Sequence, residues 1–72
     1  MQISARNQLR GTVDSVNSDG VMTEVTVRLV GGECIVSAIT TASAKRLRLA
    51  VGRPVVVFVK STEVMLGVQD DA

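Results

Sequence analysis

Apolar and polar residues alternate along the first half of the chain, and this alternation predicts three strands. Residues 7–16 follow a mostly period-2 pattern that ends at the turn-forming sequence NSDG, residues 17–20. The alternation resumes over residues 21–30, where one face is apolar and the other is mixed. Two glycines at 31–32 favour a hairpin, and residues 33–39 then predict a third strand.

The chemistry of residues 40–54 differs and is typical of a helix. Thr40 or Thr41 can cap the helix start, and good helix formers such as alanine, lysine and leucine follow. The basic residues come late, near the negative end of the helix dipole. Gly52 and Pro54 are expected to end the helix.

Two further strands are expected after the helix. Residues 55–60 form a continuous apolar run, which favours a strand buried on both faces. Residues 63–69 alternate again and predict a fifth strand, with the KST sequence at 60–62 as the corner between the two. The expected fold class is therefore all-β with one short helix, a five-stranded OB-like Greek-key barrel formed by a single domain over residues 1–72.

The composition limits how such a domain can be stabilised. A chain of 72 residues buries only about 60% of its unfolded surface. Its hydrophobic content of 46% is mostly aliphatic, because Phe58 is the only aromatic residue. Cys34 is the only cysteine and histidine is absent, which excludes an internal disulfide and a structural zinc site. Oligomerisation remains as the expected source of additional stability.

The same composition bears on location and on classes of partner. A single cysteine is typical of an intracellular protein, and neither a secretion signal nor a membrane span is evident, so we expect a soluble cytoplasmic protein without a membrane partner. Eight basic and seven acidic residues give a net charge of +1. This balance and the lack of aromatic residues oppose nucleic-acid binding.

Catalysis is not expected either, because the usual catalytic groupings are missing. Without histidine the serines lack their common activating base, and the acidic residues fall mostly at turns or on exposed strand faces. Instead, small hydroxyl side chains occur beside single cations. Ser4 stands near Arg6, Ser61 follows Lys60, and several hydroxyls mark the predicted helix start. Such groups suit an anion.

Four segments taken together resemble the molbindins and related Mop domains, which are small proteins that bind molybdate and tungstate. These segments are ISARNQLRGTV (3–13), the hairpin glycines, SAITTASAKRLRL (37–49) and VFVKSTEVMLGV (57–68). The resemblance covers essentially the whole chain. It implies an OB-like barrel with strands exchanged between two chains, and three such dimers forming a homohexamer.

The resemblance also implies oxyanion sites at the subunit interfaces, which bind molybdate or tungstate without direct ligation of the metal by side chains. The residues that match these sites are Ser4, Ala5, Arg6, Thr40, Ser43, Lys60 and Ser61. Ser4 and Arg6 are expected on one face of the first strand, where both would point at the same tetrahedral anion.

Three functions remain open on the sequence alone. The first is intracellular storage and homeostasis of molybdate by a free-standing domain, which the position of Met1 directly before QISARN favours. The second is an oxyanion-sensing module of a molybdate-responsive regulator or transporter. The third, opposed by composition, is nucleic-acid binding by the barrel. Among the other residues, Cys34, Met22 and Met65 are expected to pack in the interior.

Overall fold

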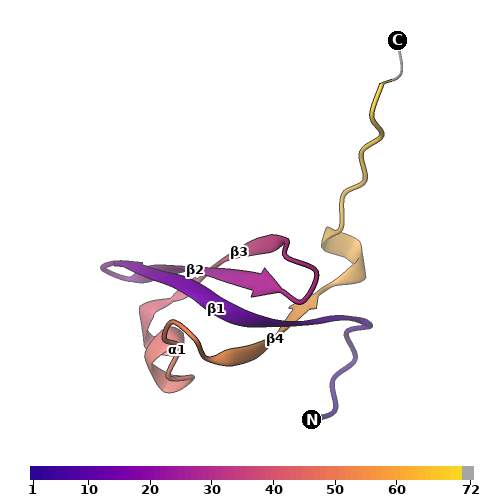
Figure 1. Cartoon of the computed structure of the whole chain (residues 1–72). Coiled ribbons are helices and arrows are strands. Elements are labelled where there is room, and N and C mark those ends of the chain that lie inside the picture. Colours follow the sequence, from indigo (N-terminus) through magenta and orange to yellow (C-terminus); the bar gives the residue numbers. More distant parts are fainter. Residues whose placement is uncertain (71–72) are drawn as a thin grey trace.

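In the computed structural model, which describes residues 1–70, four strands form one antiparallel sheet (Figure 1). The order across the sheet is β3-β2-β1-β4. The strands are β1 (Asn7–Asp19), β2 (Met22–Leu29), β3 (Cys34–Thr40) and β4 (Pro54–Val59). The first four predicted strands are therefore present. β1 is longer than predicted, because its pairing with β2 continues through the NSDG sequence up to the pair Asp19 and Met22.

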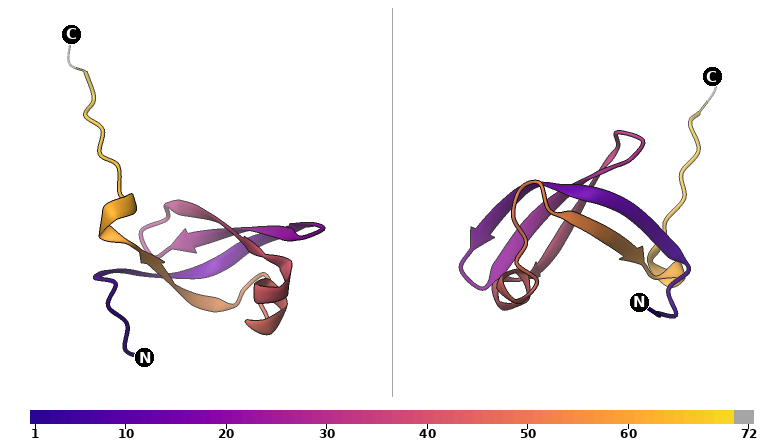
Figure 2. Two further views of the ribbon diagram at one scale, coloured as in Figure 1. Left: turned by 180° about the vertical axis from the view of Figure 1, so that it is seen from behind. Right: turned by 60° about the horizontal axis from the view of Figure 1, so that its bottom comes forward.

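The sheet is strongly curled (Figure 2), and an apolar cluster lies on its inner side. Val13, Val25 and Val27 are its most buried apolar residues, and half-buried residues of all four strands surround them. The β1–β2 register shifts between Val13 and Ser15, which marks a bulge of the kind that increases strand bending. Gly11 allows the strands to approach closely, since a Cβ atom there would lie 2.6 Å from a Val27 methyl.

The helix is much shorter than predicted. α1 (Thr41–Arg46) begins where expected, with Thr40 as its N-cap, but it has only six residues. Arg48 adopts a left-handed conformation with φ of 54°, and its N–H donates to the carbonyl of Lys45. A left-handed residue just past the last turn ends a helix, so the prediction that Gly52 and Pro54 end it is wrong.

The connection from α1 to β4, residues 47–53, is held against β1 by backbone hydrogen bonds. The Gly52 N–H donates to the Val13 carbonyl at 2.8 Å, and the Val13 N–H donates to the Arg53 carbonyl at 3.0 Å. Leu49 packs against the apolar interior from this connection. The segment therefore closes one end of the curled sheet as an ordered loop.

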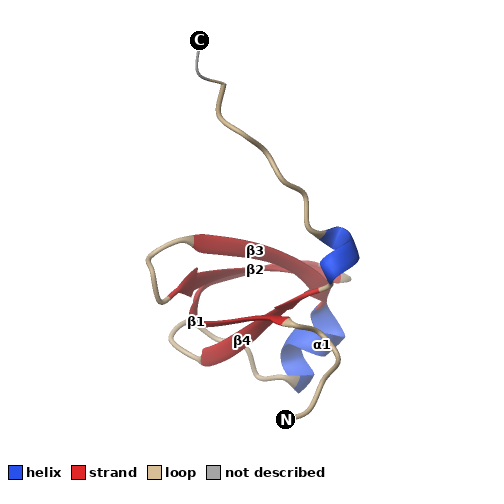
Figure 3. Ribbon diagram, turned by 90° about the vertical axis from the view of Figure 1, so that its right-hand side faces the viewer, coloured by secondary structure: helices blue, strands red, loops and turns tan. Residues whose placement is uncertain are grey.

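The predicted fifth strand is not formed within a single chain. After β4 the chain makes a short 3-10 helix, η1 (Ser61–Glu63), and residues 64–70 then lead away from the sheet without pairing (Figures 1 and 3). Met65, Leu66 and Val68 are each more than 90% exposed. The alternation of this segment predicts an extended conformation, but a strand also requires a partner, and this chain supplies none.

Several residues expected in the interior are exposed. Cys34 lies on the outer face of β3, Met22 is 45% exposed and Met65 is 93% exposed, so none of the three packs in the interior of a single chain, contrary to the prediction. The apolar strand β4 is half-buried along Val55–Val59 rather than fully buried. No helix within residues 1–70 is long and apolar enough to cross a membrane.

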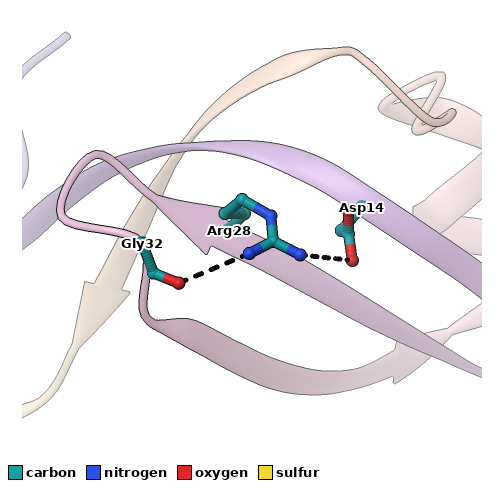
Figure 4. A network of polar contacts seen from close by, with 3 residues as sticks. All are labelled: Asp14, Arg28 and Gly32. Atoms are coloured by element: carbon teal, nitrogen blue, oxygen red, sulfur yellow. Dashed lines mark hydrogen bonds and ion pairs between the residues drawn. The ribbon is translucent and has the colours of Figure 1, made fainter.

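One ion pair lies on the outer face of the sheet within the described residues. Arg28 in β2 donates to the Asp14 carboxylate beside the bulge and to the Gly32 carbonyl, each at 3.4 Å (Figure 4). Both side chains are about half exposed. At this exposure the pair contributes little stability, about 0–1 kcal/mol.

Candidate functional site

The N-terminal segment and the end of β4 meet at one end of the sheet. Asn7 is the first residue of β1 and pairs with Val59, the last residue of β4. The Asn7 side-chain amide also donates to the Val59 carbonyl at 3.1 Å. Arg6 and Lys60 flank this last pair, so the register brings the SARN and KST sequences to the same end of the sheet.

A surface hollow lies at this meeting point. Its volume is about 490 Å³, and it is lined by Arg6, Asn7, Gln8, Leu9, Val59 and Val64. The Gln8 side chain donates to the Ala5 carbonyl at 2.8 Å, which holds the residues before β1 near the strand. The hollow has room for a small anion, and Arg6 supplies a positive charge at its wall.

One expectation about this end of the sheet is wrong. Ser4 and Arg6 do not lie on a strand, because β1 begins at Asn7 and residues 1–6 run ahead of it without pairing. Strand alternation therefore does not place the two side chains on a common face. Asn7, the last residue of the SARN sequence, is a residue of this end that the sequence pattern does not predict. The sequence signal that could have identified Asn7 is its side-chain amide at the start of one strand, which can donate to the backbone at the end of the neighbouring strand.

The helix start presents a second set of hydroxyls. Thr40 Oγ1 accepts from the Ser43 N–H at 3.1 Å and donates to Ser43 Oγ at 2.8 Å. The Thr40 hydroxyl proton is thus already used within the cap. Among residues 1–70, no acceptor is found for the hydroxyl proton of Ser43. Ser43 is therefore the residue of this pair that can donate to an anion.

A chain of three hydroxyls, of which the central one is buried, fixes the helix start against the β1–β2 hairpin. Thr41 Oγ1 donates to the Gly20 carbonyl at 2.7 Å, and it lies 2.9 Å from Thr23 Oγ1. Thr23, which is fully buried, lies in turn 2.8 Å from Ser18 Oγ. Because the proton of Thr41 is committed to Gly20, Thr23 must donate to Thr41, and Ser18 must donate to Thr23.

The two sets of predicted site residues lie at opposite ends of the sheet. Thr40 pairs with Met22, which pairs with Asp19 at the far end of β1, whereas Lys60 follows the pair at Asn7. β1 has 13 residues, so roughly 40 Å of curved strand, at about 3.3 Å per residue, separates the two sets along the chain. Figures 1 and 2 show α1 and η1 at these opposite ends. A single small anion cannot contact both sets within one chain.

The sequence profile of the TOBE domain matches residues 3–66, which is most of the chain. The chain belongs to the TOBE domain family. A probable molybdenum-pterin-binding protein of Haemophilus influenzae is 41% identical over 69 residues, covering 96% of this chain and 100% of that protein. The molybdenum transport protein ModE of Azotobacter vinelandii is 47% identical over 66 residues, but this TOBE chain covers only 24% of its length.

Two solved structures of related proteins have the same fold. MopII from Clostridium pasteurianum is 39% identical and superposes with a TM-score of 0.88, covering 93% of this chain and 100% of MopII. The cytoplasmic molybdate-binding protein ModG, in a form with molybdate bound, is 38% identical with a TM-score of 0.91, covering 96% of this chain and 49% of ModG. The expected fold class, a mostly β, OB-like fold with one short helix, is confirmed.

Proposed function

We propose that this TOBE domain binds molybdate, and tungstate in the same manner, between copies of itself. The observation that carries the proposal is the division of its anion-suited groups between the two ends of the sheet. Each set is incomplete for a tetrahedral dianion, which calls for several donors and compensating positive charge. The names of the relatives support the identity of the anion, since ModG is described as a molybdate-binding protein and a relative from Clostridium pasteurianum is named a molybdenum-pterin-binding protein.

In the proposed site each group has a distinct task. Arg6 and Lys60 supply the positive charge, whereas Ser4, Ser61 and Ser43 donate hydrogen bonds through small neutral hydroxyls. Thr40 orients Ser43, and Ala5 limits the size of the cavity. Because an oxyanion is held through its oxygen atoms, no side chain ligates the metal directly. This is a binding role that requires no catalytic step.

Isothermal titration calorimetry with molybdate tests the proposal. We expect saturable binding at micromolar molybdate and tungstate, with much weaker binding of sulfate at the same ionic strength. The smaller sulfate would leave fixed donors beyond good hydrogen-bond distance, which costs about 1 kcal/mol for each bond that is poorly made. Absence of saturable molybdate binding, or equal affinity for sulfate, contradicts the proposal.

For the assembly, we propose exchange of the C-terminal segment between two chains, and a hexamer made from three such dimers. The support is that the segment 64–70 is apolar, alternating and exposed, while β3 and β4 are both edge strands with free backbone groups. If the segment of one chain adds as a strand to an edge of another chain, its apolar side chains are covered and the backbone groups of the edge strand are paired.

Sedimentation of the intact chain and of two truncated forms tests this assembly. The chain ending after Glu63 is expected to lose the assembled form, whereas the chain ending after Gln69 is expected to keep it. A monomeric mass of 7.6 kDa for the intact chain at micromolar concentration contradicts the exchange and the shared sites together.

A second candidate role is that of a regulatory oxyanion-sensing module. It is favoured by the relatives named molybdenum transport protein ModE, because the matched part is only 24% of each of them, as expected for a module of a longer molybdate-responsive regulator or transporter. Storage and homeostasis in the cytoplasm remain the main proposal, since the relative from Haemophilus influenzae is matched over its full length and ModG is described as cytoplasmic. We expect no binding of nucleic acid or membranes in either role, which filter-binding and vesicle-sedimentation assays test.

A further inference from the structure

Positive and negative charges are separated along the chain. Residues 34–62 contain five cationic side chains and no carboxylate, giving this part a charge of +5. The remaining residues contain three cationic and seven acidic side chains, giving −4, and the two parts sum to the net charge of +1. The small net charge therefore hides a strongly basic segment.

Four of these cations gather on α1 and the connection that follows it. Lys45, Arg46, Arg48 and Arg53 are all exposed, and none forms an ion pair within the described part of the chain. Two exposed apolar side chains lie between them in sequence, Leu47 at 50% and Val51 at 70% exposure. We refer to these six residues as the basic face; α1 lies at the opposite end of the sheet from η1 (Figures 1 and 2).

Arg48 has a left-handed backbone conformation, which glycine adopts more easily than arginine does. Its φ of 54° is in the left-handed region, where a residue with a Cβ atom is strained and glycine is not. No interaction of the Arg48 side chain within residues 1–70 offsets this strain. Strain without a compensating contact is consistent with an arginine whose side chain serves a contact outside this chain.

We propose that the basic face is a docking surface for another protein, through an acidic segment of that protein that also carries apolar residues. Arginine beside apolar side chains is typical of protein interfaces. The cations have no carboxylate within their own segment, so the complementary charge must come from elsewhere. A nucleic acid fits less well, because the face has no aromatic residue to stack on bases and only four cations to contact phosphates.

A second copy of the chain also fits this face less well. Its carboxylates are dispersed over separate elements, and Asp14 is already paired with Arg28. The other acidic residues in the described part lie in β1, in β2, in the turn after it, in η1 and in the tail: Asp19, Glu24, Glu33, Glu63 and Asp70. Among residues 1–70, only the exposed segment 63–70 combines carboxylates with apolar residues, and the assembly proposed above assigns this segment to a strand edge instead.

A peptide titration tests the proposal independently of anion binding. The probe is a fluorescein-labelled synthetic peptide rich in glutamate with interspersed leucine, added to the full chain in its assembled form. We expect saturable binding that weakens as salt is added. Arg46→Glu is expected to weaken it roughly 10-fold, since the reversal removes one attraction and adds one repulsion. Lys45→Glu is a second variant with the same expectation, should the first fail to fold.

Arg10→Glu is the matched control, because Arg10 is an exposed cation on β1 outside the basic face and the change in net charge is identical. Its peptide affinity is expected to change less than twofold. Val51→Ser is expected to weaken binding by roughly threefold through lost apolar contact.

Four outcomes overturn the proposal. They are no saturable peptide binding, equal losses in the Arg46 and Arg10 variants, tighter binding of duplex DNA than of the peptide, and a change of oligomeric mass in Arg46→Glu. The last outcome would assign the face to contacts between copies.

Discussion

Asn7 and Val59 form the last pair of the β1–β4 ladder, and the Asn7 side-chain amide reinforces it with a 3.1 Å hydrogen bond to the Val59 carbonyl. Arg6 directly precedes Asn7, and Lys60 directly follows Val59, so the bonded pair is adjacent in sequence to both cations. It joins the segment before β1 to the segment after β4. Asn7 is therefore a positioning residue for the proposed cationic half of the site.

Asn7→Ala is expected to weaken molybdate binding by about 0.5–1.5 kcal/mol, the typical contribution of one such hydrogen bond. The loss arises because the segments that carry Arg6 and Lys60 are no longer tied together. Asn17→Ala provides the control, since Asn17 lies on the same strand, is exposed and has no side-chain hydrogen bond in the described part. Calorimetric titration of both variants measures the difference, and equal affinities would remove Asn7 from the site.

Lys60→Ala is expected to weaken molybdate and tungstate binding alike by about 2–5 kcal/mol, because a desolvated dianion would lose a charged partner. Arg28→Ala removes the same charge near the middle of the sheet, away from both Lys60 and Ser43 in the register, and is expected to leave affinity within about 0.5 kcal/mol. Titration at low salt distinguishes the two. An unchanged affinity in Lys60→Ala would place the anion site elsewhere.

Ala5→Val tests whether small side chains set the size of the anion cavity. Added methyl groups are expected to penalise molybdate and tungstate more than sulfate, so the ratio of molybdate to sulfate affinity should fall. Ala50→Val adds the same methyl groups at an exposed position in the connection and should leave this ratio unchanged. Competition titrations with both anions measure the ratio, and a constant ratio in Ala5→Val would exclude Ala5 from the cavity wall.

Thr23→Val is expected to lower the free energy of unfolding by about 1–3 kcal/mol. The change keeps the shape of a fully buried side chain but leaves Ser18 without its acceptor and Thr41 without its donor. Thr26→Val, on the same strand and without a side-chain hydrogen bond in the described part, is expected to be nearly neutral. Urea denaturation measures both, and Thr23→Ser should restore most of the loss if the hydroxyl is responsible.

Arg48→Gly is expected to raise the free energy of unfolding by about 0.5–1 kcal/mol, because glycine adopts the left-handed conformation at the helix end without strain. Arg46→Gly should have the opposite sign, at a cost of roughly 1 kcal/mol, since Arg46 lies in the regular helix. Denaturation curves of the two variants at one protein concentration provide the comparison. Destabilisation by Arg48→Gly would mean that the arginine forms a contact that offsets its strain.

The first three strands were predictable because one face of each is more buried than the other, which leaves an alternation of apolar and polar residues in the sequence. Alternation could not assign the faces of β3 correctly, since Cys34 and Val36 on its outer face are as apolar as Ile35 and Ile39 on its inner face. The length of the helix was not predictable from propensity. It is limited by the conformation of a single residue, Arg48, and by the hydrogen bonds of the connection to β1.

The candidate site was predictable only in part. Residue types and spacing identified groups suited to an anion, and the β1–β4 register brings Arg6 close to Lys60 in the ladder. The sequence could not reveal that Thr40 and Ser43 belong to the other end of the sheet, because that separation depends on which strands pair. Likewise, alternation in residues 63–69 predicts an extended conformation but cannot say which chain provides the neighbouring strand.

In the proposed inter-chain site, the placement of anion-suited groups at the two ends of β1 makes capture of the anion depend on the abundance of the protein. A site whose donors come from different chains does not exist in an isolated chain. Dilution that separates the chains therefore lowers the number of sites as well as their occupancy. Anion and assembly then stabilise each other by mass action. The amount of anion retained should rise more steeply than the first power of protein concentration until the assembled form predominates, and linearly thereafter.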